Sequence, residues 1–210
     1  MSIKHTLTAL ALLAGTSAAL AGPIYNLDAG YTQFHLEHEI SETQLRGGSV
    51  YTLTKDNYDS NSALRLGAEA VFQTGDGLDW LAAASATYSG DSERQLDAVN
   101  LGNGSPASLR ASLDTAWLLN LRTGLRWHQE LLPNLHLHAD GTLSINQLRT
   151  VYEEPGYSDK SSDNFFTWDL ALGFNYKFTP ALSAVLDAGA QLDNDYRILQ
   201  YTAGLRYSLR

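Results

Sequence analysis

The 210-residue chain contains no cysteine. A small exported fold held together by disulfides is therefore excluded, and stability must come from a packed core or from closure of a sheet. After residue 22 the chain also lacks any run of about 18 apolar residues, the length of a helix that crosses a bilayer. Basic residues are scarce, with 14 Lys and Arg against 23 Asp and Glu. We therefore expect no nucleic-acid partner.

The first 21 residues are predicted to be a secretory signal. Lys4 supplies the positive start, Leu7 to Leu13 supply most of a short apolar segment, and small residues suit cleavage at Ala18, Ala19 and Ala21. We expect residues 1–21 to be removed and residues 22–210 to form one domain. Without Lys4 the chain keeps 13 basic and 23 acidic residues, a net charge of −10.

Apolar and polar residues alternate over eight stretches, which is the period of a strand with one apolar face. The expected strands cover about residues 31–40, 64–73, 78–88, 113–128, 135–145, 166–178, 183–192 and 196–210. In the first strand, the apolar face is expected to carry Thr32, Phe34, Leu36 and Ile40. The polar face is expected to carry Tyr31, Gln33, His35, Glu37 and Glu39.

The segment from Ser105 to Leu118 allows two interpretations. Leucines and Trp117 recur every four residues after Ser105 and Pro106, which is typical of an amphipathic helix. We expect a strand from about Leu113, preceded by a short helix in the loop. Thr123 and Gly124 suit a helix interior poorly, and the sheet needs this strand in order to close.

The connections between the expected strands alternate between long and short. The long ones cover residues 41–61, 89–112 and 149–164, and the short ones cover 74–77, 130–134 and 179–181. A soluble lipocalin-like barrel, the main alternative, gives no reason for such sorting. Bacterial outer-membrane barrels have short periplasmic turns and longer external loops. The sequence therefore predicts an all-β fold, an eight-stranded antiparallel up-and-down transmembrane β-barrel.

Aromatic residues on the expected outward face gather near the two ends of the strands, where amphipathic rings prefer a membrane interface. Those near the short turns are Phe72, Trp80, Trp127, Tyr176, Phe178 and Tyr207, and those near the long loops are Tyr88, Trp117, Phe166 and Trp168. We interpret them as two aromatic girdles.

The last stretch, Tyr196 to Arg210, alternates apolar Leu199, Tyr201, Ala203, Leu205, Tyr207 and Leu209 with small or polar residues. It resembles the closing strand of bacterial outer-membrane barrels, which in that family is also the assembly signal. By architecture, the whole mature chain is similar to small barrels of the OmpA transmembrane-domain and OmpX type. The resemblance implies an outer-membrane location, a monomer, and contact with outer-membrane lipids, lipopolysaccharide and the assembly machinery.

The expected inward face carries charges of both signs. We expect a lumen ion-pair network of Glu37, Arg65, Glu69, Arg122, Arg126, Asp140, Asp169, Lys177, Asp187 and Arg206. Buried charges persist when they are paired, and an eight-stranded interior is just wide enough for side chains to fill. We therefore favour a plug over an open conduit. Around the turn near Pro133, an antiparallel register is expected to pair Arg126 with Asp140, or with His138 if the register slips by one pair.

His128, His136, His138 and Asp140 flank the same turn and could form a metal or acid–base site. Their spacing is that of any alternating strand, so we favour a pH-sensitive polar network. We expect no cofactor, no metal and no catalytic residues.

The expected function is a structural or surface-interaction role with a plugged lumen and acidic external loops. The acidic loop residues include Glu42, Asp56, Asp59, Asp91, Glu93, Asp97, Glu153, Glu154, Asp159 and Asp163. A narrow porin-like channel for ions or small solutes is the alternative. A lipid-modifying enzyme is a second alternative, since deacylases, palmitoyltransferases and the larger omptin proteases share this architecture.

Overall fold

The computed structural model describes residues 22–46, 48–74, 77–90, 92–113, 115–154 and 157–209, so the expected signal segment lies outside the described residues. Within these ranges every regular element is a strand. The strands are β1 (Ile24–Arg46), β2 (Ser49–Phe72), β3 (Leu78–Ser89), β4 (Ser92–Asn100), β5 (Pro106–Leu113), β6 (Thr115–Leu132), β7 (Leu135–Glu154), β8 (Tyr157–Lys177), β9 (Leu182–Leu192) and β10 (Tyr196–Leu209).

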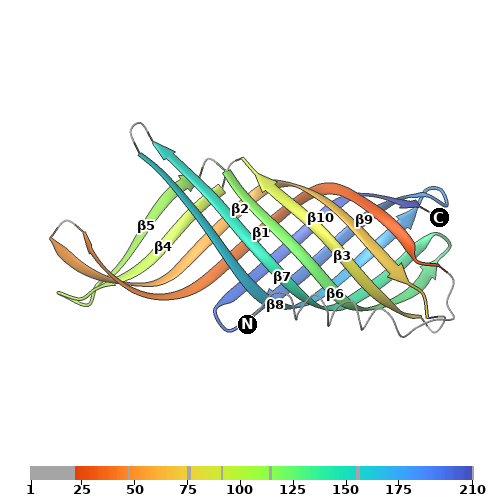
Figure 1. Ribbon diagram of the computed structural model, residues 1–210, viewed down its shortest axis with the longest axis horizontal. Coiled ribbons are helices and arrows are strands. Elements are labelled where there is room, and N and C mark those ends of the chain that lie inside the picture. Colours follow the sequence, from red (N-terminus) through yellow and green to blue (C-terminus); the bar gives the residue numbers. More distant parts are fainter. Residues whose placement is uncertain are drawn as a thin grey trace.

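Eight of these strands form a closed antiparallel ring (Figure 1). The hydrogen-bonded order is β1-β10-β9-β8-β7-β6-β3-β2, and β1 also pairs with β2. The last strand pairs with the first from Tyr25 opposite Leu209 to His38 opposite Tyr196. Each ring strand therefore has partners on both edges, which leaves no open edge within the ring. The predicted eight-stranded up-and-down barrel is confirmed.

The two ends of the barrel differ. One end, called here the turn end, holds Ile24, Leu209 and the short connections at 73–77, 133–134 and 178–181. Asn134 adopts a left-handed φ of 70° in the second of these turns, a conformation that asparagine tolerates better than most residues. The opposite end, called the hairpin end, holds the connections around residues 47–48, 101–105, 155–156 and 193–195.

The three connections expected to be long loops are β-hairpins instead. β1 and β2 remain paired up to Arg46 opposite Ser49, and β7 and β8 up to Glu154 opposite Tyr157. β4 pairs with β2 on one side and β5 on the other, so β1, β2, β4 and β5 form one sheet beyond the ring. Figure 1 shows this sheet and the β7–β8 hairpin extending separately from the ring.

The segment from Ser105 to Leu118 is extended in the structure. β5 pairs with β4 from Pro106 to Leu113, and β6 begins at Thr115. The expected short helix is therefore wrong, because its segment forms the separate strand β5, and the ring strand β6 begins at Thr115, close to the expected start at Leu113. The four-residue leucine repeat is outweighed by a continuous ladder of backbone hydrogen bonds to β4.

The outward face of the ring is apolar on every strand. Exposed large apolar side chains include Leu27, Leu66, Leu78, Leu121, Ile145, Leu170, Leu186 and Leu205. A closed belt of this kind would be an unusually large exposed patch in water, whereas it matches the hydrocarbon core of a bilayer.

The expected faces of the first strand were inverted. Tyr31 is 70% exposed on the outward face, whereas Thr32, Phe34 and Leu36 are buried inside the barrel. The alternation separates the two faces of β1 correctly, but the apolar face points into the barrel and not toward lipid. Phe34 and Leu36 instead belong to an apolar cluster inside the barrel.

Candidate functional site

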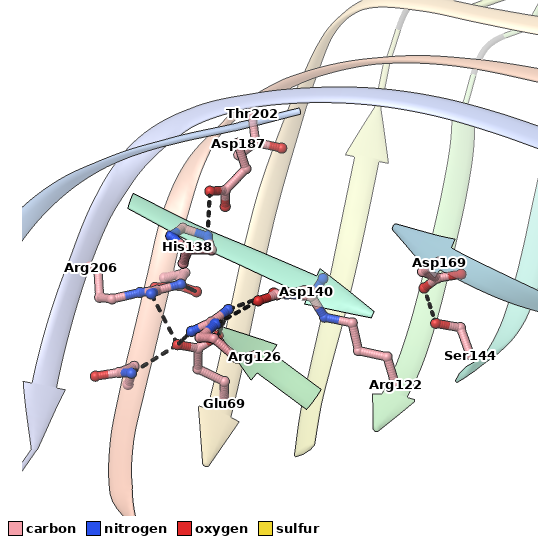
Figure 2. Close-up of polar contacts among 12 residues, drawn as sticks. Glu69, Arg122, Arg126, His138, Asp140, Ser144, Asp169, Asp187, Thr202 and Arg206 are labelled. Atoms are coloured by element: carbon pink, nitrogen blue, oxygen red, sulfur yellow. Dashed lines mark hydrogen bonds and ion pairs between the residues drawn. The ribbon is translucent and has the colours of Figure 1, made fainter. Parts of the chain in front are cut away.

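A chain of alternating charges crosses the interior near the turn end (Figure 2). Arg126 donates from Nε to Asp140 and from Nη1 to Glu69, at 2.7 and 2.8 Å. Arg206 donates from Nη1 to the same Glu69 oxygen at 3.0 Å and from Nε to Asp28 at 2.7 Å. The five groups come from β7, β6, β2, β10 and β1, so they join walls of the ring that are not neighbours in the sheet.

The register expected for the β6–β7 hairpin is confirmed, because Arg126 lies directly opposite Asp140. Both carboxylate oxygens of Asp140 accept from Arg126 at 2.7 Å, in the two-point geometry that fixes guanidinium–carboxylate pairs. Arg126 and Asp140 are only 5% and 4% exposed. Their charges are therefore compensated inside the barrel rather than by solvent.

A second polar group lies nearby in the interior. His138 on β7 contacts Asp187 on β9 at 3.1 Å, and Gly173 on β8 lies beside them. A Cβ at Gly173 would stand 2.6 Å from Cε1 of His138 and closer still to Asp187. The pair therefore depends on a glycine at that position.

The remaining residues of the expected lumen network occupy different places. Arg122 lies 3.9 Å from Asp140, and Arg65 donates to the Thr202 hydroxyl at 3.4 Å. Asp169 accepts hydrogen bonds from Ser144 and Thr167. Lys177 lies at the turn end, and among the described side chains it has no ion pair.

Glu37 does not belong to the lumen network, and that expectation is wrong. It lies on the other face of β1, where its carboxylate is 3.6 Å from Nζ of Lys55 and 3.3 Å from Nε2 of His35. The inverted phase of β1 explains the error. The same inversion hid Asp28, which faces inward and pairs with Arg206. Asp28 is four residues before the inward Thr32, and residues an even number apart on a strand share a face. With the correct face assigned, the alternation would have placed Asp28 inside.

A buried apolar cluster, called here the apolar plug, lies inside the barrel toward the hairpin end. Phe34, Leu36, Tyr58, Ala63, Ala116, Leu118, Leu148, Phe165 and Ile198 form one buried cluster. They come from β1, β2, β6, β7, β8 and β10, so the cluster is built from most of the ring. Leu36 and Ile198 are 0% exposed. Sequence reasoning missed the plug because apolar residues were assigned to the lipid side.

Tyr196 packs against the plug, and Tyr58 within it makes a polar contact. Tyr196 stacks between His38 and Phe165, with ring centroids 4.1 and 4.0 Å apart. Tyr58 donates to Asp56, which also accepts from Arg94 at 2.7 Å. The interior thus holds a charged layer near the turn end and an apolar layer toward the hairpin end.

The histidines around the β6–β7 turn do not converge. His128 contacts Asp79 at 3.1 Å, His138 contacts Asp187, and His136 makes neither contact. Within the described parts of the chain, no cluster of three or more His, Cys, Asp or Glu side chains has the geometry of a metal site.

The expected aromatic residues lie on the outward face at two levels. Trp117 and Trp127 are ten residues apart on β6, and Phe166 and Tyr176 are ten apart on β8. A strand rises about 3.3 Å per residue and tilts by about 40° in such barrels, so ten residues cover about 25 Å. That is the height of the apolar band of an outer-membrane barrel. Tyr25, Tyr31 and Tyr201 are additional exposed aromatics.

The hairpin end is acidic. Residues 33–60, 89–116, 149–166 and 193–197 contain fifteen acidic and seven basic residues, a net charge of −8. On β1, His35 lies between Asp59 and Glu37. Partial burial opposes protonation, but the hydrogen bonds to both carboxylates outweigh it and raise the pKa of His35. The hydrogen bond from His35 lowers the pKa of Glu37.

In the part of the chain that the structure describes, no helix is long and apolar enough to cross a membrane.

No protein-family model matches the chain, and no curated protein matches its sequence. Among solved structures, it is similar to Ail, the attachment invasion locus protein of Yersinia pestis, crystallised with the heparin analogue sucrose octasulfate. Identity is 8%, the TM-score is 0.49, and the match covers 90% of this chain and 100% of that one.

It is also similar to OprG, an outer membrane protein from Pseudomonas aeruginosa, at 15% identity and a TM-score of 0.48, over 91% of this chain and 97% of that one. Neisserial surface protein A gives 13% identity and a TM-score of 0.47, over 91% and 99%. These similarities concern the fold alone. The closed ladder and the outward apolar belt of the ring have the architecture of a transmembrane β-barrel.

Proposed function

We propose that this outer-membrane barrel is closed to solutes and acts through its extended hairpins, which project from the cell surface. The apolar plug carries the proposal. A conducting barrel needs a polar path from end to end, whereas here nine buried side chains from six strands fill the interior above the charged layer.

The direction of the barrel follows from the sorting of its connections. The short turns and the two chain ends of the barrel lie together, as on the periplasmic side of bacterial barrels, and the hairpins lie opposite. The hairpin end then presents its net charge of −8 outside the cell. Like charges repel and opposite charges steer association, so a cationic surface is the kind of partner that this end favours.

A binding role suits the hairpins better than a catalytic one. β1, β2, β4 and β5 form an ordered sheet whose outer edge is β5, so they present a fixed surface outside the ring. The protein is proposed to act as a monomer, with the ring complete within one chain.

Three single-cysteine variants test this proposal, and the absence of native cysteine makes each label unique. Ser105→Cys lies at the tip between β4 and β5, Thr179→Cys at the turn end, and Ser144→Cys inside the barrel. On intact cells a membrane-impermeant maleimide should label only the first. After permeabilisation the second should react, and the third should react only after unfolding. Labelling of Thr179→Cys on intact cells would reverse the orientation, and labelling of folded Ser144→Cys would contradict the closed interior.

A further inference from the structure

A groove crosses the outer wall of the barrel on the lipid-facing side. Its volume is about 590 Å³, and it runs across β2, β3, β6, β7 and β8. One wall follows the register row of Leu66, Ala86, Leu119, Gln147 and Asn164. The other follows the next outward row of Ala68, Ala84, Leu121 and Ile145. The backbone of the inward residues between the rows forms the floor.

The groove changes character along its length. On β2 and β3 its walls are mostly alanine, with Ala68 opposite Ala84, and they lie just below the level of Tyr88. On β7 and β8 the row that starts at Leu66 ends in two outward amides, Gln147 opposite Asn164. Asn164 lies beyond Phe166, on the hairpin side of the aromatic girdle. The groove therefore climbs from the hydrocarbon level to the headgroup level, because the strands are tilted.

Two cationic side chains continue this polar end. Arg149 is the next outward residue after Gln147 on β7, and it lies opposite Trp117 and Ser162. Lys160 follows Ser162 on the outward face of β8, so it is a diagonal neighbour of Arg149 at roughly 7–8 Å. Both side chains are exposed, and neither forms an ion pair with a described side chain.

We propose that this groove holds one lipopolysaccharide molecule in a fixed orientation. An acyl chain lies between the two rows, the amides of Gln147 and Asn164 meet the polar linkages of the glycolipid, and Arg149 and Lys160 bind a phosphate. Guanidinium groups match phosphate oxygens at two points, and a lysine adds a mobile positive charge. The occupant is a phosphorylated lipid of the outer leaflet because the polar end of the groove faces the hairpin end. The assignment to the outer leaflet rests on the proposed orientation of the barrel.

Native mass spectrometry of the full barrel in detergent, with purified bisphosphorylated lipid A added, tests the site. The wild type should retain one lipid A. Ala84→Phe fills the groove without changing the backbone ladder and should reduce retention about tenfold. Ala188→Phe is the matched control, because Ala188 is also exposed on the outward face but lies on β9, outside the groove. It should retain lipid A like the wild type.

The phosphate contact is tested with Arg149→Gln combined with Lys160→Gln. This variant should bind bisphosphorylated lipid A about tenfold more weakly than the wild type does. It should bind bisphosphorylated and dephosphorylated lipid A equally well. Heat-modifiable gel migration checks that every variant is folded. Equal retention by Ala84→Phe and Ala188→Phe would overturn the groove. If the wild type retained phosphatidylglycerol as well as it retains bisphosphorylated lipid A, and the Gln variant lost both to the same extent, the occupant would be an ordinary phospholipid. Because the assay uses detergent, it does not depend on orientation, which the cysteine labels test separately.

Discussion

Arg126 is held by two acidic side chains at once, Asp140 and Glu69. Replacing Arg126 by alanine leaves both carboxylates without this partner, whereas Asp140→Ala leaves Arg126 bound to Glu69. We expect each single variant to lose about 3–5 kcal/mol, with Arg126→Ala at the upper end, and the double variant to lose much less than the sum. Urea unfolding in lipid vesicles measures the cycle. Simple additivity would show that the two charges do not interact.

Gly173 and Gly189 face the interior at similar depth but differ in their surroundings. A Cβ at Gly173 would collide with His138 and Asp187, whereas at Gly189 the nearest atom is the Cβ of Ala171 at 3.4 Å. We expect Gly173→Ala to cost about 1–3 kcal/mol through overpacking and Gly189→Ala to cost less than 1 kcal/mol. Thermal unfolding of the two variants makes the comparison. Equal losses would show that the interior is loose enough to accept a methyl group at either site.

His35 makes stability at the hairpin end depend on pH. Its pKa is raised in the folded protein, so its contribution is complete below the ordinary value near 6.5 and is lost as the pH rises through the higher folded value. His35→Gln should therefore be less stable than the wild type at pH 5.5, by less than about 1 kcal/mol, and the two should converge at pH 8.5. A difference that grew toward high pH would contradict this assignment.

The Arg126–Asp140 pair could be predicted from sequence because a short turn fixes the register of its hairpin. Glu37 and Asp28 could not be placed in the same way. In β1, Phe34 and Leu36 are apolar because they belong to the plug, yet the alternation would look the same if they faced lipid. Periodicity gives two faces, and it does not tell which one is inside.

At the scale of elements, β4 and β5 stand outside the closed ring. Replacing residues 92–113 by a short Gly-Ser linker between β3 and β6 should therefore leave the barrel folded, because every ring strand keeps both of its neighbours within the ring. Heat-modifiable migration and the circular dichroism signal per strand residue should be preserved. Loss of heat-modifiable migration would mean that this hairpin is required for closure.

The strands of the hairpins are longer than the sequence predicts, for a physical reason. Outside the membrane both faces of a strand can be polar, so the alternation that marks the ring strands fades in segments such as 41–61. Here the backbone ladder, which no side-chain pattern reports, extends the strands. The residues between Ser105 and Leu118 show the same effect, since pairing with β4 overrides a helical leucine repeat.

At the scale of the whole molecule, the fold was predictable because three independent features agree. The alternation, the two aromatic levels ten residues apart and the short turns all require a strand barrel that spans about 25 Å. The filling of that barrel was only half predictable. Charged residues on a membrane strand can be predicted to face inward. Apolar residues of the plug cannot be told by sequence from apolar residues that face lipid.

Planar-bilayer recording of the purified wild type tests whether the charged and apolar layers together close the interior. A general porin in the same membranes serves as the positive control. If the proposed closure holds, the barrel should insert without producing steady conductance steps at moderate voltage, because ions would have to pass both the Arg126 network and the apolar plug. Stable, reproducible conductance steps from the folded wild-type protein would show that the interior is open and would identify a channel.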